Sequence, residues 1–258
     1  MLRYLPGYDP LMVMTSRGPE VPRLAEMRSL WLSAATAALE EDQAVAGVAL
    51  VGSLGDGRAD DWSDVDLLIA VQDAALDDFA SPAHLPCGTG QLTFAIDARH
   101  NGPRGTRAVS GQYVFNGLPL WVDWHVHPVS LASWPSNGTV LFDRAGIPAT
   151  PAGFSEYLNR GEHETATTNS TEEGQAMRLA LVPVAGKHLA RRSLEAPRMI
   201  EFLGGPYEPA ATWQTQLVTL HRLLDGFATL GRPDGLTAGR AYLDLLEQIL
   251  SNRLQDGV

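Results

Sequence analysis

Hydrophobic positions in the first part of the chain predict one helix followed by several short strands. Between residues 22 and 42 apolar side chains recur at helical spacing, which indicates a helix packed on a sheet. Asn116-Gly117 separates two apolar runs, and because both residues tolerate a positive φ, a hairpin with a type I′ turn is expected there. Short apolar runs predict strands at 45–52, 65–71, 91–98, 112–116, 118–127 and 140–143.

The second part of the chain has a different pattern. Residues 147–174 are polar and rich in Thr, so we expect a partly helical connection or linker there. Helical periodicity then predicts helices at about 173–193, 196–203, 207–230 and 236–253. The expected fold is α/β (α+β), with a mixed sheet flanked by helices in a catalytic domain at 1–146 and a C-terminal helical bundle in a substrate-binding domain at 147–258.

Composition and charge narrow the class of protein. The 258 residues are 45% hydrophobic, enough for one large core or two modest ones. The formal net charge of −11 argues against a nucleic-acid partner, because phosphate contacts need clustered Lys and Arg. The single cysteine, Cys87, cannot form an internal disulfide, and no apolar run is long enough to span a membrane. We expect a cytoplasmic monomer or homodimer with no membrane partner.

The segment VALVGSLGDGRADDWSDVDLLIAV, residues 48–71, contains the first candidate site. An apolar strand ends at Gly52 and Ser53, and a loop leads to Asp64 and Asp66 at the next strand. Side chains alternate along a strand, so the two carboxylates share a face, with Cα atoms about 7 Å apart. Such a pair favours a bound cation, and Mg²⁺ prefers carboxylate oxygens. A Gly-Ser turn beside it suits phosphate oxygens.

A third carboxylate lies in the strand LPLWVDWHVHP. Alternation places four residues on one face: Trp121, Asp123, His125 and His127. A carboxylate in a buried strand needs a partner, and a metal held by Asp64 and Asp66 would supply one. Asp97, on another strand, is the competing candidate. Asp123-x-His125-x-His127 also has the spacing of a transition-metal site, and that alternative stays open. Otherwise the histidines line an acceptor pocket or hydrogen-bond the carboxylates.

These motifs resemble the polymerase-β-like nucleotidyltransferase superfamily. The shared pattern is Gly52-Ser53, ten intervening residues, Asp64-Val65-Asp66 and a later strand carboxylate. The segment GSLGDGRADDWSDVDLL is similar to that of kanamycin nucleotidyltransferases. The chain looks most like the small antibiotic nucleotidyltransferases of the aminoglycoside and lincosamide type. The specific resemblance covers about 25 residues and the Asp123 strand, and the rest is architectural.

The resemblance implies transfer of a nucleoside monophosphate, with AMP from ATP as the expected case, to a hydroxyl of a small molecule, releasing pyrophosphate. By position, Asp64, Asp66 and Asp123 would bind two Mg²⁺ ions, and Asp123 would also assist deprotonation of the acceptor. Gly52 and Ser53 would hold the β and γ phosphates. An aminoglycoside-like antibiotic is a candidate acceptor, and antibiotic resistance is a candidate role.

Three further positions bear on the reaction. Lys187, in Ala185-Gly186-Lys187, matches a lysine that reaches the nucleotide phosphates in the kanamycin enzymes. Arg58 is a second candidate phosphate contact, and each of these two is as readily interpreted as a solvated surface residue. Those enzymes also carry a catalytic glutamate four residues before the lysine, where this chain has Pro183. A proline can neither accept a proton nor continue a helix smoothly. The general base is therefore unassigned, and kanamycin is not predicted as the substrate.

Two other classes of function are open. One is a module on the same fold that modifies a protein or neutralises a toxin. The other is a nucleotide-binding protein without catalysis. The three acids argue against the second, because their mutual repulsion would only destabilise a protein that binds no cation.

Overall fold

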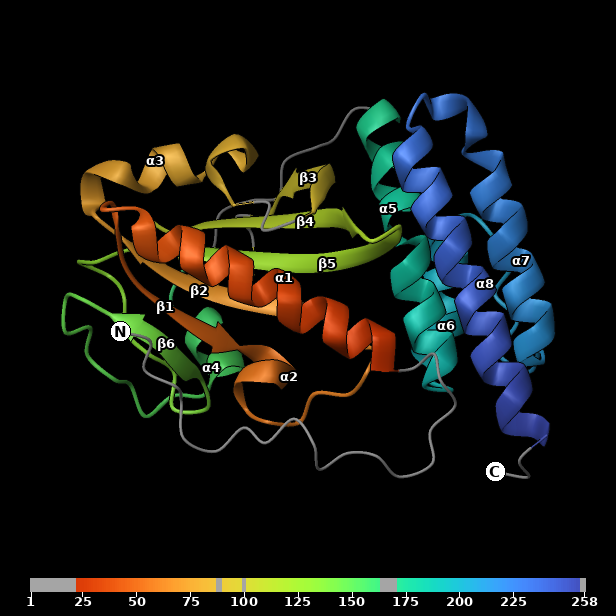
Figure 1. Cartoon of the computed structure of the whole chain (residues 1–258), viewed down its shortest axis with the longest axis horizontal. Helices are drawn as coiled ribbons and strands as arrows, with labels where there is room; N and C mark the ends of the chain where they lie inside the picture. Colours follow the sequence, from red (N-terminus) through yellow and green to blue (C-terminus); the bar gives the residue numbers. More distant parts are fainter. Residues whose placement is uncertain (1–21, 87–89, 99–100, 163–170, 256–258) are drawn as a thin grey trace.

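A mixed six-stranded sheet occupies one half of the computed structural model, which describes residues 22–86, 90–98, 101–162 and 171–255 (Figure 1). The strand order is β3-β4-β5-β2-β1-β6. β2 and β5 are parallel, and the other paired strands are antiparallel. The strands are β1 (Val45–Val51), β2 (Val65–Val71), β3 (Gln91–Asp97), β4 (Arg107–Phe115), β5 (Leu118–Pro128) and β6 (Thr139–Asp143).

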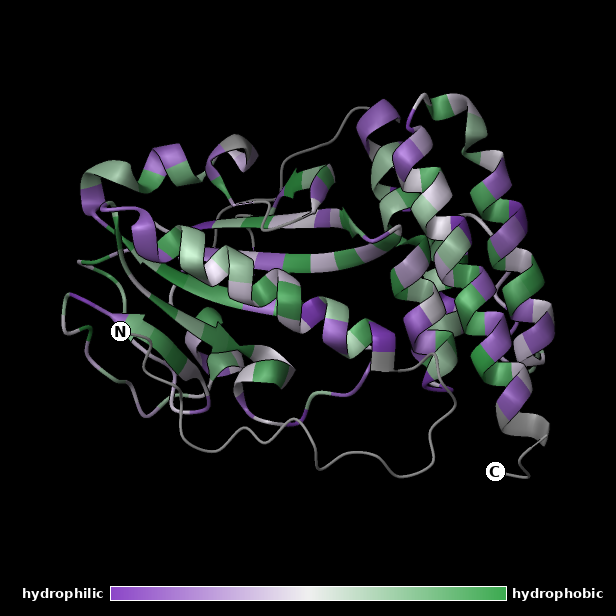
Figure 2. Cartoon of the chain, in the orientation of Figure 1, coloured by the Kyte–Doolittle hydropathy of each residue, from purple (hydrophilic) through white to green (hydrophobic). Residues whose placement is uncertain are grey.

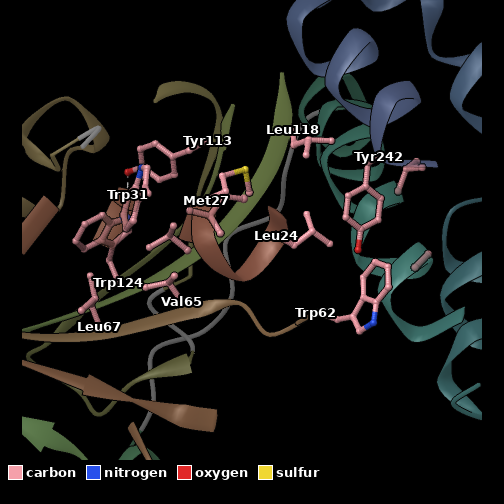
Figure 3. Close-up of a cluster of buried hydrophobic side chains, with 14 of the residues drawn as sticks. Leu24, Met27, Trp31, Trp62, Val65, Leu67, Tyr113, Leu118, Trp124 and Tyr242 are labelled. Carbon is pink, nitrogen blue, oxygen red and sulfur yellow. Dashed lines mark hydrogen bonds between the residues drawn. The ribbon is translucent and has the colours of Figure 1, made fainter. Parts of the chain in front are cut away.

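One face of the sheet is covered by α1 (Pro22–Glu41) and the short α3 (Leu76–Phe79) (Figure 1). Trp31 of α1 is fully buried and lies against Tyr113 and Trp124, with ring centroids 5.0 and 5.8 Å away (Figure 3). These rings join the odd-numbered positions of β2 in one apolar layer. The strands therefore turn their Val, Leu and Ile side chains toward α1, as the alternating pattern predicts.

The opposite face is covered in part by α4 (Phe154–Leu158). Ile147, Phe154 and Tyr157 form an apolar cluster with Leu68 and Ala70 of β2. Residues from 147 to 158 thus pack on the sheet, although the sequence assigned them to the helical half. We propose that the boundary between the two halves lies after this segment and before residue 171.

Four helices form the second half: α5 (Thr171–Ala190), α6 (Glu195–Phe202), α7 (Trp213–Gly226) and α8 (Pro233–Gln255). α5 packs against each of the others. Hydrophilic and hydrophobic residues alternate along these helices, while β1 and β2 of the sheet are mostly hydrophobic (Figure 2). One continuous core joins the two halves, and the edge-to-face contact of Trp62 with Tyr242 of α8 is part of it (Figure 3).

The predicted fold class is confirmed, with differences at some element boundaries. Asn116 and Gly117 have φ values of 51° and 76°, as the predicted hairpin requires. β4 begins five residues earlier than predicted, because pairing with β5 outweighs the weak strand propensity of its small residues. α7 begins at Trp213 rather than near 207, because Thr212 caps it by accepting a hydrogen bond from the Thr215 N–H.

The sequence analysis also considered the single cysteine and the possibility of a membrane span. Cys87 lies outside the described residues. No helix that the structure describes combines the length and apolarity needed to cross a bilayer.

Candidate active site

Asp66 and Asp123 lie side by side on the two central strands. The parallel register of β2 and β5 pairs them directly. Register partners project from the same face, so both carboxylates lie on the face that α4 partly covers, which we call the acid face. Asp64 immediately precedes β2 and lies close enough for its charge to raise the pKa of Asp66. The structure thus brings the three predicted acids together.

Two hydrogen bonds orient the carboxylate of Asp123. Ser110, its partner on β4, donates from Oγ to Asp123 Oδ1 at 2.5 Å. The indole Nε1 of Trp121 donates to the same oxygen at 3.1 Å. The sequence did not indicate Ser110, and it placed Trp121 on the same face as Asp123 without a role. Both fix the direction of the third acid.

The turn after β1 lies against Asp66. Gly52 begins the short helix α2 (Gly52–Gly55) with a φ of +61°. A Cβ at Gly52 would lie 2.2 Å from Asp66 Oδ2, so the turn can approach the carboxylate only with glycine in this place. Ser53 is the next residue of α2. The predicted Gly-Ser turn is therefore adjacent to the predicted acids.

Lys187 reaches from α5 to the acid face. Its ammonium donates a hydrogen bond to Asp64 Oδ2 and forms an ion pair with it, and the lysine side chain is only 10% exposed. Gly186 lets α5 approach α8 closely, since a Cβ there would lie 3.1 Å from the ring of Tyr242. The structure places Lys187 in the site rather than on the surface.

A narrow pocket of about 40 Å³ opens beside this ion pair. We call it the Lys187 pocket; Asp64, Pro183 and Tyr242 are among its lining residues. Pro183 therefore faces the site at the position where the resembled enzymes carry a glutamate, and it provides no acid. This chain therefore differs from the resembled enzymes in a residue that lines the site.

α5 nevertheless continues through Pro183 as one helix, contrary to the expected disturbance. A proline removes one N–H donor from the helix and crowds the preceding turn. Gln112, buried on β4, donates from Nε2 to the carbonyl of Ala180 at 2.9 Å, in the turn before the proline. The carbonyl that loses its donor to Pro183 is that of Leu179, one residue earlier, so this contact ties the helix to the sheet beside the weakened turn.

The loop before Asp64 is held from both halves of the protein. Arg28 of α1 is buried and donates to the carbonyls of Asp60 and Ser63, at 3.1 and 2.8 Å. Arg191, just after α5, donates from Nε to Asp60 Oδ2 at 2.8 Å. Arg191 was not among the site residues predicted from the sequence. These contacts fix the loop that delivers Asp64.

Burial and mutual repulsion act on the three acids. Burial, with the charges of Asp123 and Asp64, raises the pKa of Asp66 to about 8. Burial also raises the pKa of Asp64, against the opposing effect of Lys187. Burial raises the pKa of Asp123 as well, although the hydrogen bonds from Ser110 and Trp121 oppose it. The acid face therefore favours a proton or a cation at neutral pH.

His125 and His127 follow Asp123 on the same face of β5. Both are buried, and their contacts are with other residues than the three acids. His125 meets the ring of Phe154 edge-on at 5.0 Å, and His127 Nδ1 lies 2.9 Å from the hydroxyl of Tyr157. Burial lowers the pKa of His125 to about 4; burial and neighbouring charges lower that of His127 to about 3. Both imidazoles are neutral at pH 7.

No three His, Cys, Asp or Glu side chains in the described part of the chain are arranged to hold one metal ion. The Asp123-x-His125-x-His127 triad is therefore not assembled, and Tyr157 engages one of its imidazole nitrogens. Among the acids, Asp66 and Asp123 are the adjacent pair, and Lys187 holds Asp64. Three carboxylates without a cation repel one another. Asp64 therefore pairs with Lys187 instead of joining Asp66 and Asp123.

The two remaining sequence candidates lie apart from this pair. Arg58 is 80% exposed and forms an ion pair with Asp56. Asp97 pairs with Val109, which pairs with Trp124, so its side chain is on the face opposite to Asp123. Asp97 therefore does not compete with Asp123 as the third acid.

A larger pocket of about 380 Å³ borders Asp66 and Asp123, and we call it the α4 pocket. β4 and β5 supply one part of its lining: Ala108, Val109, Ser110, Asp123, Trp124 and His125. The segment around α4 supplies another: Phe154, Ser155, Leu158 and Asn159. Asp66, Ala98 and Asn101 complete it. The sequence did not predict α4, so this wall was missed.

Residues 33–83 match the family described as nucleotidyltransferase domain. The matched segment contains β1, the Gly52 turn, the loop held by Arg28 and both Asp64 and Asp66. The chain carries a nucleotidyltransferase domain. The superfamily that the motifs resemble is thereby confirmed, and Asp123 and Lys187 lie outside the matched segment. The likeness to antibiotic enzymes stays a prediction.

Two other comparisons were made with known proteins. No curated protein sequence matches this nucleotidyltransferase. Among solved structures, it is similar to a STING-associated CdnE c-di-GMP synthase from Capnocytophaga granulosa, with 11% identity and a TM-score of 0.31 over 92% of this chain and 83% of that chain. A likeness of this size carries no argument about the substrate.

Proposed function

We propose that this nucleotidyltransferase transfers a nucleoside monophosphate, AMP from ATP in the expected case, to a hydroxyl of a small molecule. The observation that supports this proposal is the in-register placement of Asp66 and Asp123 on adjacent parallel strands. Gly52 lies against one of these carboxylates, and Lys187 lies beside the third acid. An anionic triphosphate and its cations would meet complementary groups here.

The donor set fits a hard divalent cation. Carboxylate oxygens are the ligands that Mg²⁺ prefers, and the raised pKa of Asp66 marks a place where positive charge would be stabilising. Asp66 and Asp123 would hold Mg²⁺, and Asp64 would join them once Lys187 has turned to the phosphates. Two bound Mg²⁺ ions would stabilise the attacking and leaving oxygens.

The proposed reaction is an in-line displacement at the α-phosphorus. The acceptor oxygen forms a bond to that phosphorus, and the bond from the phosphorus to the leaving pyrophosphate oxygen breaks. Asp123, oriented by Ser110 and Trp121, takes up the hydroxyl proton. Lys187 and the Gly52-Ser53 turn hold the β and γ phosphates. Pro183 cannot serve as the base, so this assignment replaces the glutamate of the resembled enzymes.

Pyrophosphate release tests the proposal directly. The full chain is incubated with Mg²⁺, each nucleoside triphosphate in turn, and panels of aminoglycosides, lincosamides and cell-lysate protein. We expect release that needs Mg²⁺, is supported best by ATP and is stimulated by a small-molecule panel. Asp66→Asn should abolish release while leaving the far-ultraviolet circular dichroism spectrum unchanged. An active D66N protein would remove the metal assignment, and stimulation by lysate protein alone would favour a protein-modifying enzyme.

A further inference from the structure

We propose that the α4 pocket binds the acceptor and selects an uncharged molecule that carries hydroxyl groups beside an apolar part. This inference rests on the proposed function, because it assigns the second substrate of the same reaction. The pocket borders both Asp66 and Asp123, so a hydroxyl group inside it would lie beside the proposed metal site and beside the proposed base. Its volume of about 380 Å³ is in the range of small-molecule sites.

The distribution of cationic side chains separates the two pockets. The Lys187 pocket contains Arg28 and Lys187. No Lys or Arg is among the described residues that line the α4 pocket. Arg160, close to α4 in sequence, lies over the ring of Tyr157 at 3.9 Å. A triphosphate needs cationic partners, so it belongs on the Lys187 side and leaves the α4 pocket to the acceptor.

The charge of the acceptor follows from the acidic residues. Among the described lining residues of the α4 pocket, Asp66 and Asp123 are the carboxylates. Both are proposed metal ligands, so their charge is offset once the nucleotide and its cations have bound. A polycationic aminoglycoside would then find no further carboxylate in this lining. An anionic acceptor would find no cation in it.

The remaining lining combines neutral polar groups with apolar surface. Asn101, Ser155 and Asn159 are exposed at the rim, where their amide and hydroxyl groups can bond to hydroxyls. Phe154 and Leu158 present apolar surface from the same wall. Hydroxylated compounds with an aromatic or aliphatic part match this mixture better than fully polar sugars do.

The first experiment compares acceptor classes with the full chain and MgATP. The uncharged probes are adenosine, 4-nitrophenyl glucoside and chloramphenicol; the charged probes are kanamycin, neomycin and glucose 6-phosphate. Pyrophosphate release above the rate with water alone is measured, and mass spectrometry identifies the adenylylated product. We expect kcat/KM for the best uncharged probe to exceed that of every charged probe by at least about tenfold. Equal or better use of a charged probe overturns the proposal.

The second experiment places the acceptor in the pocket. Ser155→Leu fills the rim, and it should raise KM for the uncharged acceptor about tenfold without raising KM for ATP. Glu156→Leu is the matched control, since Glu156 is the next residue of α4, is exposed and lies outside the pocket lining. Asn159→Asp adds a carboxylate and should shift the preference toward kanamycin.

The outcomes distinguish this inference from the function on which it rests. A rise of KM for ATP in S155L would mean that the donor nucleoside occupies the α4 pocket, and it would overturn the inference. Binding of MgATP is measured by calorimetry. If MgATP binds but none of the uncharged probes does, the inference is overturned and the proposed function stands. Absence of MgATP binding would instead refute the proposed function.

Discussion

Asp66 and Asp123 are register partners across the parallel pair β2 and β5. Their separation is therefore set by the backbone hydrogen bonds of two central strands rather than by flexible side chains. The sheet holds two half-buried carboxylates together against their repulsion, and one of them is further fixed by Ser110 and Trp121. We propose that such a pair is organised for a cation before any ligand binds.

Stability of the metal-free protein should fall as the pH rises, because of Asp66. Its pKa is raised from 3.8 to about 8 in the folded protein. Between these two values the folded protein binds a proton that the unfolded chain lacks, so stability decreases across this window. Melting temperatures measured with EDTA between pH 5 and pH 8 should show this decline, and Asp66→Asn should reduce its slope. Mg²⁺ at pH 8 should restore the wild-type melting temperature but not raise that of D66N.

Gly52→Ala should inactivate the enzyme beyond its effect on stability. The φ of +61° at Gly52 costs an alanine about 1–2 kcal/mol, and the new Cβ would collide with Asp66. Gly57→Ala is the control, since Gly57 has a φ of +74° and nothing within 4 Å of its Cβ position. In urea unfolding G57A should lose only the stability that the positive φ costs, and G52A should lose more because its Cβ also collides with Asp66. Turnover should fall by about a hundredfold or more in G52A alone; an equal loss in G57A would contradict the proposed role of the close approach.

Lys187→Met should weaken ATP binding more than it weakens the fold. The ammonium is proposed to leave Asp64 for the phosphates, and a charge-assisted hydrogen bond of this kind is worth about 1.5–3 kcal/mol. We expect the dissociation constant of MgATP, measured by calorimetry, to rise by about tenfold or more. Arg192→Met, an exposed position just after α5, should leave it unchanged. If K187M binds ATP as tightly as the wild type does, Lys187 does not bind the phosphates and its role is limited to the contact with Asp64.

The ion pair of Asp60 with Arg191 should show measurable coupling. Partial burial raises the pKa of Asp60, but the hydrogen bonds from Arg191 and Ser63 outweigh it and lower the pKa to about 2. A double-mutant cycle with Asp60→Asn and Arg191→Ala should give about 0.5–1 kcal/mol at pH 7, because the pair is partly exposed. This coupling should disappear as the pH falls below 3.8 toward 2, where the carboxylate is protonated. The exposed pair Glu195 and Arg198 serves as the reference, and equal coupling there would argue against a specific role.

Part of the site follows from local sequence rules. The apolar runs and the Asn116-Gly117 turn predicted β1, β2 and the β4–β5 hairpin. Counting outward from a two-residue turn pairs Phe115 with Leu118 and, further along, Ser110 with Asp123, as the structure has it. The hydrogen bond from Ser110 was therefore within reach of the sequence, because a hairpin turn fixes its own register.

Other parts of the site depend on contacts that no local pattern encodes. The pairing of Asp66 with Asp123 joins two parallel strands with no turn between them to set the register. Lys187 meets Asp64 across a sequence separation of 123 residues. α4 is a helix of five residues that is stabilised by packing on the sheet, and its polar surroundings gave no helical period.

The continuous core has a practical consequence for protein engineering. Leu24, Trp62 and Leu120 belong to the same apolar cluster as Leu243 and Leu246 of α8. A recombinant fragment that ends before residue 171 would leave this apolar surface in water and should aggregate. Exchange of the helical bundle between related enzymes would likewise succeed only if the residues that contact each other across the core, such as Trp62 and Tyr242, were exchanged as a set.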